Sequence, residues 1–314
     1  MSGGRRAYVV ACLAGNGIGP EMTAAASRAM AQVAREHGFR VDEVHPPFDG
    51  EAVTRSGHPL PAQTRRATLA ADAVLVAGAS TPALEGLEAE LDLGAAVIRS
   101  LDQRGAVLTV VTPLHEGAQD WAVERAFATA RARHGRLASV GVNGAWRTRV
   151  DVHAGAHDGV EVEHVPLAEA LEALASETPG FDVLVVETGL ADALTGAPRL
   201  AGRRRLSASG LLSPTGPGLF APSHGAAHDI AGQGVANPSE MLLAAALMLG
   251  EGLGRRAAAE ALEESLAAAL AASVRPPDMA GGLVGATTRE FVDVVLGLLP
   301  SARRDTEFAL GVTR

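Results

Sequence analysis

The amino-acid sequence predicts an α/β fold with a largely parallel β-sheet. Apolar runs of strand length alternate with longer segments whose apolar residues recur at helical spacing. The C-terminal third consists mostly of helical patterns. Such alternation is typical of parallel sheets covered by helices. With 314 residues, 47% of them hydrophobic, the chain is long enough for one large domain or two ordinary ones.

The expected elements follow one another in a regular order. We expect strands within 7–15, 39–47, 71–79, 106–113, 137–144 and at both ends of 160–189. We expect helices within 19–38, 61–72, 118–135, the middle of 160–189, 238–253, 254–273 and 287–299. Two connections leave alternatives open. Segment 147–159 is a surface loop or a protruding arm, and the basic segment 199–210 is a solvated turn or a partial clamp for phosphate or carboxylate.

Composition excludes several classes of protein. The net charge of −9 argues against a nucleic-acid binder, which needs a dense basic face. The sequence contains no apolar run of the roughly 18 residues that a membrane span requires, and the N-terminus leads into a glycine turn rather than a cleavage site. A cytoplasmic protein is therefore expected. The single cysteine, Cys12, excludes an internal disulfide and is expected in the core.

Segment 224–238, "HGAAHDIAGQGVANP", is the most unusual stretch of the chain. It carries two histidines, an aspartate and three glycines, and its apolar residues follow no clean period of 2 or 3.6. Glycine and asparagine tolerate positive φ angles. The stretch therefore predicts a long ordered loop whose backbone a ligand can approach.

Several segments together resemble the isocitrate/isopropylmalate dehydrogenase family of β-decarboxylating dehydrogenases, as a divergent member most similar to its isopropylmalate dehydrogenases. "GNGIGPE" at 15–21 matches the family's first turn, with Asn16 where the family usually has aspartate. "FDVLVVETGLADAL" at 181–194 matches a strand and the metal-binding turn. Segment 209–249 is close to the family pattern, and "PPDMAGGLVGATTREF" at 276–291 resembles its closing segment.

The resemblance implies a two-domain fold of the isopropylmalate dehydrogenase type, with a mixed, largely parallel sheet and a central cleft. Residues 1–104 and 204–314 would form a cofactor-binding domain that holds both termini. Residues 105–203 would form an inserted domain, whose arm contributes to a homodimer interface.

The resemblance also implies an NAD site. Asp229 matches the acidic position that accepts hydrogen bonds from the adenosine ribose, and its charge would repel the 2′-phosphate of NADP. His224 would lie against the adenine and Asn237 would bond its edge. Asp92 matches the acidic position near the nicotinamide ribose. The remaining implied cofactor-binding residues are Gly225, Ile230 and Asp278.

The chemistry that the resemblance implies needs residues that this chain lacks in part. In the family, aspartates hold a divalent metal that polarises a hydroxy acid during hydride transfer, and arginines grip its carboxylates. Asp192 matches the first metal-binding aspartate and Arg99 the first arginine, so these two are the candidate catalytic residues. Arg104 fits the second arginine only if the register slips. The second aspartate falls on Gly196, and one carboxylate is too few to hold Mg²⁺ or Mn²⁺ securely.

The family's proton-transfer residues, a lysine and a tyrosine, are missing from their expected places. The chain contains no lysine, and its single tyrosine, Tyr8, lies in the first predicted strand. Segment 140–146 occupies the place of the lysine, and segment 112–121 is a shortened version of the tyrosine loop. Because each such group contributes typically ~10²–10⁴-fold to the rate, their combined loss indicates changed chemistry or none.

Three hypotheses for the function follow. The first is an NAD-dependent oxidoreductase with a remodelled site for a small hydroxy acid, in which His115, His153 or His157 supplies acid–base chemistry. The second is a catalytically inactive homodimer that senses NAD or binds another protein. The third is a non-redox lyase or isomerase that uses the same cleft.

Overall fold

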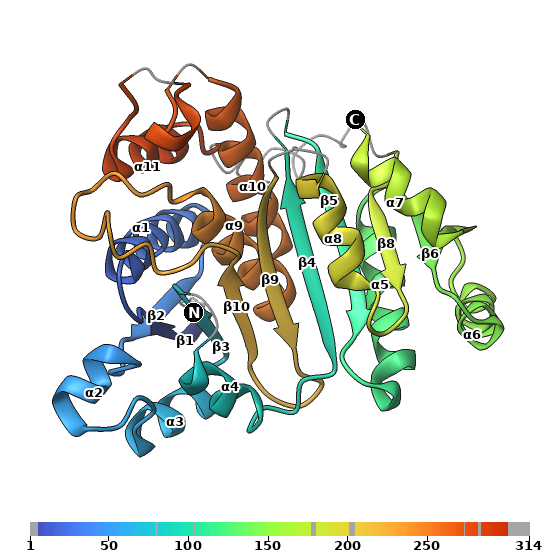
Figure 1. Cartoon of the computed structure of the whole chain (residues 1–314), viewed down its shortest axis with the longest axis horizontal. Helices are drawn as coiled ribbons and strands as arrows, with labels where there is room; N and C mark the ends of the chain where they lie inside the picture. The colour runs from blue at the N-terminus through green and yellow to red at the C-terminus, as the bar shows by residue number, and fades with distance from the viewer. Residues whose placement is uncertain are drawn as a thin grey trace, which may run out of the picture.

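The computed structural model describes residues 6–78, 81–102, 105–176, 180–200, 205–272, 274–281 and 284–300. Within these ranges the chain forms one ten-stranded β-sheet and eleven α-helices, which confirms the predicted α/β class (Figure 1). The strands are β1 (Ala7–Leu13), β2 (Arg40–Val44), β3 (Ala73–Val76), β4 (Ala95–Leu101), β5 (Val107–Pro113), β6 (Arg136–Val140), β7 (Glu161–Val165), β8 (Val183–Val186), β9 (Leu206–Leu212) and β10 (Gly218–Pro222). The helices are α1 (Gly19–Glu36), α2 (Gly50–Ser56), α3 (Ala62–Leu69), α4 (Pro82–Glu88), α5 (Gln119–Ala132), α6 (Gly144–Ala154), α7 (Leu167–Ala175), α8 (Ala191–Leu200), α9 (Ser239–Leu247), α10 (Arg256–Ala271) and α11 (Thr288–Gly297).

The sheet consists of two parallel halves that run in opposite directions. Its strand order is β2-β1-β3-β10-β9-β4-β5-β8-β6-β7. The first four strands pair in parallel, as do the last four. The two middle strands, β9 and β4, pair antiparallel with each other and with their outer neighbours. The sheet is therefore mixed but largely parallel, as the sequence predicts.

The two faces of the sheet are covered differently. One apolar cluster on the back face joins α1, α5, α9, α10 and α11 to strands from both halves. The front face carries two separate clusters: α4 covers β1, β3 and β10 together with Phe48, Leu60 and Ala71, whereas α7 and α8 cover β5, β6 and β8. Figure 1 shows α9 and α10 behind the middle strands and α8 in front of β5. The middle of the front face, over β9 and β4, lies between these two clusters.

Most predicted elements are present, but one segment differs in kind. Polar segment 147–159, expected as a loop or arm, belongs largely to helix α6. The Asn143 side chain accepts a hydrogen bond from the Trp146 N–H and so begins this helix, while Trp146 and Val150 supply its buried contacts. With so few buried residues the helix has almost no apolar periodicity, so its pattern does not reveal it.

Other expectations fare as follows. Cys12 lies in the back-face core, as expected, and is 1% exposed. Segment 224–238 forms the expected irregular loop. No helix among the described residues is long and apolar enough to cross a membrane. The division into residues 1–104 with 204–314 and residues 105–203 stays a prediction.

Candidate functional site

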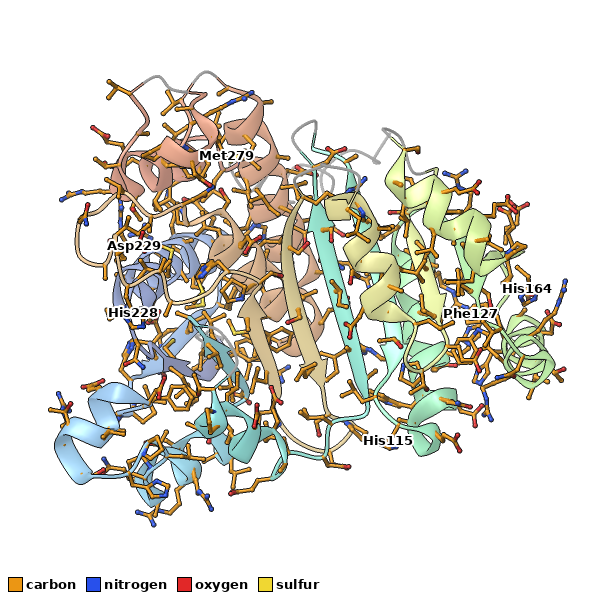
Figure 2. The ribbon with its side chains drawn as sticks, in the orientation of Figure 1. His115, Phe127, His164, His228, Asp229 and Met279 are labelled. Carbon is orange, nitrogen blue, oxygen red and sulfur yellow. The ribbon has the colours of Figure 1, made fainter. Side chains whose placement is uncertain are left out.

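A cavity of about 910 Å³ opens over the middle of the sheet's front face. One wall is the loop 223–238 with segment 278–279, the floor comes from the ends of β4 and β9, and the other wall is α8. Figure 2 shows the loop, with His228 and Asp229 labelled, on the side away from α8. This volume lies in the range of sites for small molecules and cofactors, about 300–1,000 Å³.

The loop wall is fixed by a close backbone contact with the turn after β1. The Ile18 N–H donates to the Ala226 carbonyl oxygen at 2.8 Å. Gly17 has φ +59°, and a Cβ atom there would lie 1.9 Å from the same oxygen. Asn16 accepts a hydrogen bond from the Gly50 N–H and donates to Asp49 at 2.7 Å. An aspartate at position 16 could not make both contacts, which explains the departure from the family pattern.

His224 lines the cavity, and one nitrogen of its ring has no hydrogen-bond partner among the described residues. Its Nδ1 lies 3.1 Å from the Gly225 carbonyl oxygen, which can only accept, so Nδ1 carries the proton. Its Nε2 is buried and has no hydrogen-bond partner among the described residues. Burial lowers the pKa of this imidazole, so the ring is neutral near pH 7 and Nε2 keeps its lone pair. A ligand N–H or O–H would satisfy it.

The other residues implied for the cofactor are only partly brought together. Ile230, Asn237 and Asp278 line the cavity. The Asn237 amide donates to both carboxylate oxygens of Asp278, at 3.2 and 3.3 Å, and its oxygen accepts from the backbone at the start of α9. Gly225 and Asp229 are exposed on the same loop but do not line the cavity. Asp229 therefore lies beside the cavity rather than in its wall.

Asp92 lies away from the cavity. β4 pairs antiparallel with β9, so Ala95 and Leu212 lie at one end of the pair and the cavity-lining Leu101 and Leu206 at the other. Asp92 precedes the first of these ends, where it accepts a hydrogen bond from Thr215 at 3.1 Å. The structure does not bring it to the cofactor loop.

Arg99 is committed to an internal ion pair. Its guanidinium lies 2.5 Å from Glu263 of α10 and 3.6 Å from Glu251, and its side chain is 8% exposed. Burial alone would lower the pKa of Arg99, but the two carboxylates outweigh burial and raise it. Its partner Glu263 belongs to α10, which packs on the back face, so the arginine lies on the side of the sheet opposite α8. Arg104 lies outside the described residues.

The α8 wall supplies one carboxylate. Asp192, in the first turn of α8, lines the cavity together with Thr195 and Gly196. A Cβ atom at Gly196 would meet nothing within 4 Å, so the position of the family's second aspartate is open space. The other cavity acids have partners, since Asp278 accepts from Asn237 and Glu240 accepts from the Ser207 N–H. This donor set does not fit Mg²⁺ or Mn²⁺, which need several oxygen ligands.

The places expected for lysine and tyrosine have structural roles. Segment 140–146 ends β6 and begins α6, where buried Glu187 accepts hydrogen bonds from the Val142 N–H, at 2.7 Å, and from the Asn143 amide. Tyr8 is 5% exposed and packs edge-to-face on Phe39 in the back-face core. His115 is exposed at the end of β5 and does not line the cavity.

Several cavity residues are not among the candidate site residues predicted from the sequence. They include Ile18, Thr195, Ser223, Glu240 and Met279, and also Arg205, Ser207 and Ser209, which are covered only by the clamp alternative for segment 199–210. Ser207 and Ser209 alternate along β9, which is the one sequence signal that could have placed two hydroxyls on one face. Of the basic segment 199–210, residues 201–204 lie outside the described part, and Arg205 lies in the cavity wall.

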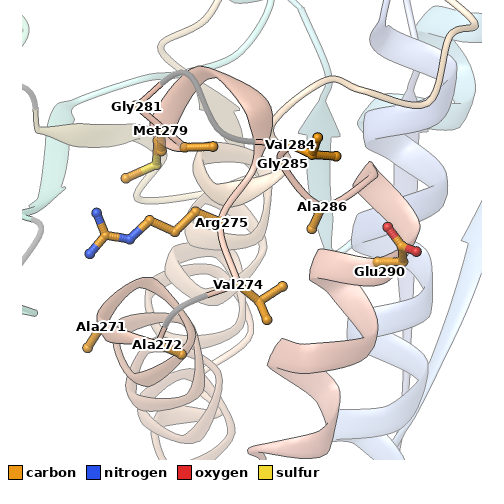
Figure 3. A pocket seen from close by; sticks show the side chains of 11 residues that line it. Ala271, Ala272, Val274, Arg275, Met279, Gly281, Val284, Gly285, Ala286 and Glu290 are labelled. Atoms are coloured by element: carbon orange, nitrogen blue, oxygen red, sulfur yellow. The ribbon is translucent and has the colours of Figure 1, made fainter.

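A second cavity of about 660 Å³ adjoins the first. It lies between the end of α10, the neighbouring segment 274–281 and α11, and Met279 lines both cavities (Figure 3). Glu290, at its edge, belongs to the capping box that begins α11. Most of its lining residues are small and apolar, and its charged side chains are those of Arg275 and Glu290.

Comparisons with known proteins agree on one family. The model of the isocitrate/isopropylmalate dehydrogenase family matches residues 9–101 and 102–295. The chain is 35% identical to a 3-isopropylmalate dehydrogenase of Synechococcus sp. (strain CC9605), over 86% of this chain and 93% of that protein. It is 29% identical to a 3-isopropylmalate dehydrogenase of Streptococcus mutans, over 92% of this chain and 99% of that protein.

Two solved structures share the fold. A β-decarboxylating dehydrogenase of Thermococcus kodakarensis superposes with a TM-score of 0.77 at 24% identity, over 93% of this chain and 96% of that chain. An isocitrate dehydrogenase of Methylococcus capsulatus superposes with a TM-score of 0.76 at 22% identity, over 93% and 99%. These structures support the two-half sheet described above.

Proposed function

The chain belongs to the isocitrate/isopropylmalate dehydrogenase family, and we propose that it binds NAD in the 910 Å³ cavity and uses it to oxidise a small hydroxy acid in a remodelled site. The observation that carries this proposal is the composition of the cavity. Its loop wall holds His224, Ile230 and Asn237, and its opposite wall holds Asp192. A cofactor wall and a polar substrate wall thus face one space.

The fit of NAD rests on the loop wall. Among the described residues, Nε2 of His224 has no hydrogen-bond partner, and a turn of the ring would bring this nitrogen to the cavity, where an amino group on an adenine ring can donate to it. The exposed Asp229 carboxylate beside the cavity would attract ribose hydroxyls and repel a 2′-phosphate, which favours NAD over NADP. Bound NAD would supply the hydride acceptor.

On the opposite wall we assign Asp192 to the substrate. Its carboxylate is exposed to the cavity, where it can accept a hydrogen bond from the substrate hydroxyl and then its proton. Arg205 brings a positive charge to the same cavity, as a carboxylate-bearing substrate requires. Because the cavity does not fit the family's metal, no step is assigned to one.

The test is a panel of small 2-hydroxy acids with NAD, followed by the absorbance of NADH. We expect turnover with at least one acid, and a rate at least ~10²-fold lower in Asp192→Asn. Asp92→Asn is the matched control, because that carboxylate lies at the far end of β4 and its loss should leave the rate unchanged. An Asp192→Asn enzyme as fast as the parent would contradict the assignment.

One observation favours a second candidate, a non-catalytic NAD-binding protein. The chain contains no lysine, and its one tyrosine is buried away from the cavity. This candidate predicts saturable NAD binding without NADH formation across the whole panel. Any turnover that disappears in Asp192→Asn would exclude it.

A further inference from the structure

A cluster of histidines and carboxylates lies on α5 and α6, at the edge of the sheet away from the cofactor loop. Asp120 and Glu124 stand one helical turn apart on α5, whereas His153 lies in the last turn of α6 and His157 follows in the turn after that helix. One ligand atom each from Glu124, His153 and His157 lies within 4.8 Å of the others. Figure 2 shows Phe127 of α5 at this edge and Asp229 at the opposite side of the molecule.

Ring stacking holds the two imidazoles in place. The His157 ring lies 4.8 Å from the Phe127 ring at an interplanar angle of 16°. The His153 ring is nearly parallel to both, 6.4 Å from each. The histidine side chains are only 19% and 12% exposed, whereas the Glu124 side chain is 52% exposed. Two fixed nitrogen ligands therefore face one adaptable carboxylate.

His153 is oriented as metal-binding histidines usually are. Its Nε2 lies 3.3 Å from Asp120 Oδ1, so this nitrogen carries the proton and donates it to the carboxylate. Its Nδ1 faces Glu124 Oε2 at 3.5 Å, on the side from which a metal would bind. A carboxylate that accepts from the outer nitrogen fixes the ring and makes the inner nitrogen a better ligand. Asp120 is itself held by Arg149 at 2.6 Å.

In His157, by contrast, the nitrogen that faces Glu124 is the one that carries the proton. Its Nε2 lies 2.7 Å from Glu124 Oε2, and its Nδ1 lies 2.8 Å from the Arg131 guanidinium. Since arginine only donates, Nδ1 accepts and Nε2 carries the proton. A metal at Nε2 would move this proton to Nδ1, and the exposed Arg131 would have to turn away. Arg131 therefore opposes metal binding, and a change at this residue should alter the metal affinity of the site.

We propose that Glu124, His153 and His157 form a binding site for Zn²⁺ or a similar transition-metal dication, with Asp120 as the carboxylate that orients His153. Two imidazole nitrogens and one carboxylate oxygen are a donor set that zinc prefers, and water completes a tetrahedron. Ligands around tetrahedral zinc lie roughly 3.3 Å apart, given bonds of roughly 2.0–2.1 Å. The present separations of up to 4.8 Å require a small closure, which the exposed Glu124 can supply.

The metal would join α6 to α5. The buried contacts of α6 come from Trp146 and Val150, and the metal would add a link at its other end. Among the described residues a second group of potential ligands, Cys12 with Glu43 and His45, is a weaker candidate. Burial, followed by the charge of Glu43, raises the pKa of the Cys12 thiol far above its usual range, so the thiolate that a metal needs is disfavoured.

The test is calorimetric titration of the chelator-treated full chain with zinc chloride. We expect one tight equivalent per chain and a rise in melting temperature. The affinity should fall at least 10-fold in His153→Ala and in His157→Ala, and stay unchanged in His115→Ala, which changes an exposed histidine outside the cluster. Arg131→Gln should bind several-fold more tightly, because glutamine can accept from a protonated Nδ1.

Cobalt provides a readout that does not depend on variant folding. With Co²⁺ in place of zinc, the parent chain should develop visible d–d bands of a nitrogen- and oxygen-ligated tetrahedral ion, at one equivalent. Absence of saturable zinc binding, or binding that persists with the same affinity in the His153→Ala/His157→Ala double variant, would overturn the proposal. A calorimetric equivalent without tetrahedral cobalt bands would overturn it as well.

Discussion

The two walls of the cavity differ in how far they keep the residues that the family resemblance implies. On the loop wall, backbone contacts hold the chain in place: the Ala226 carbonyl oxygen packs against Gly17 and accepts from the Ile18 N–H. The His224 side chain is left to face the cavity. Of the two residues expected to act on a substrate, Asp192 lines the other wall, whereas Arg99 pairs with Glu263 on the back face of the sheet. A loop fixed through its backbone does not depend on the side chains of the opposite wall, so the two walls can differ independently.

The largest expected effect is on stability, at Arg99, and it distinguishes a structural role of this residue from a role in substrate binding. Arg99→Ala leaves the buried Glu263 carboxylate uncompensated, so urea unfolding should show a loss of roughly 3–5 kcal/mol. The double variant Arg99→Leu/Glu263→Leu should recover much of it, because apolar side chains can replace a buried pair. NAD affinity of the folded variants should not change. If the Arg99→Ala protein is as stable as the parent but has a higher KM for the substrate, Arg99 belongs to the site, as the family resemblance implies.

The next largest effect concerns the contact that fixes the loop wall. Gly17→Ala would place Cβ 1.9 Å from the Ala226 oxygen at a positive φ, so we expect a loss of roughly 3 kcal/mol and at least 10-fold weaker NAD binding. Gly15→Ala is the matched control. Gly15 also has a positive φ, +65°, but nothing lies within 4 Å, so roughly 1–2 kcal/mol is expected. Equal losses of unfolding free energy in the two variants would mean that the contact between Gly17 and Ala226 does not fix the loop wall.

A substitution at Gly196 can add the second carboxylate ligand that the α8 wall lacks. Gly196→Asp would add a second carboxylate one helical turn from Asp192, in open space facing the cavity. Calorimetry should show Mg²⁺ binding at least 10-fold tighter than in the parent chain. Ala193→Asp adds the same charge to an exposed α8 position outside the cavity wall and should not do so. Tight Mg²⁺ binding by the parent would contradict the donor count given above.

A smaller effect is expected at Asp229, on the rim of the loop wall. Asp229→Asn should reduce the preference for NAD over NADP by about 5- to 10-fold, because the carboxylate is exposed and its repulsion of a 2′-phosphate is screened. The preference of the parent should itself weaken as salt is added. Asp92→Asn changes an aspartate at the far end of β4 and serves as control. An unchanged ratio in Asp229→Asn would place the ribose elsewhere.

The smallest effect is a pH dependence from His224. Burial lowers the pKa of this histidine in the folded chain below the usual value of about 6.5. Between the folded and unfolded values the unfolded chain binds more protons, so this contribution to stability is complete above pH 6.5 and is lost as the pH falls toward the folded pKa. His224→Gln should flatten the fall in unfolding free energy between pH 7 and 5. A curve of the same slope in both proteins would mean that the ring is not desolvated.

The fold follows from the sequence where the apolar pattern is strong. Strand β3 lies within its expected bounds because it is a continuous apolar run buried on both faces, and helix α1 because burial of one face imposes a period of 3.6. Helix α6 escapes prediction because it buries little beyond Trp146 and Val150. Asn143 caps this helix by accepting a hydrogen bond from the Trp146 N–H, and that contact is seen only in the structure.

The candidate site is predictable on one wall and not on the other. The glycines of segment 224–238 and its resemblance to the family pattern predict a ligand-binding loop. In the structure His224, Ile230 and Asn237 of this loop line one cavity. Arg99 and Asp92 have the right residue type and spacing, but strand pairing turns the first to the back face and places the second at the far end of β4. A one-residue difference in register reverses a side chain, and the sequence pattern does not fix that register.

The most direct measurement is a calorimetric titration of the purified full chain with NAD, with and without Mg²⁺, and with NADP beside it. The account predicts one saturable NAD site per chain, an affinity that Mg²⁺ does not change, and weaker binding of NADP. Failure of NAD to bind, or binding that appears only when Mg²⁺ is added, would contradict the claim that an intact cofactor wall faces a remodelled substrate wall.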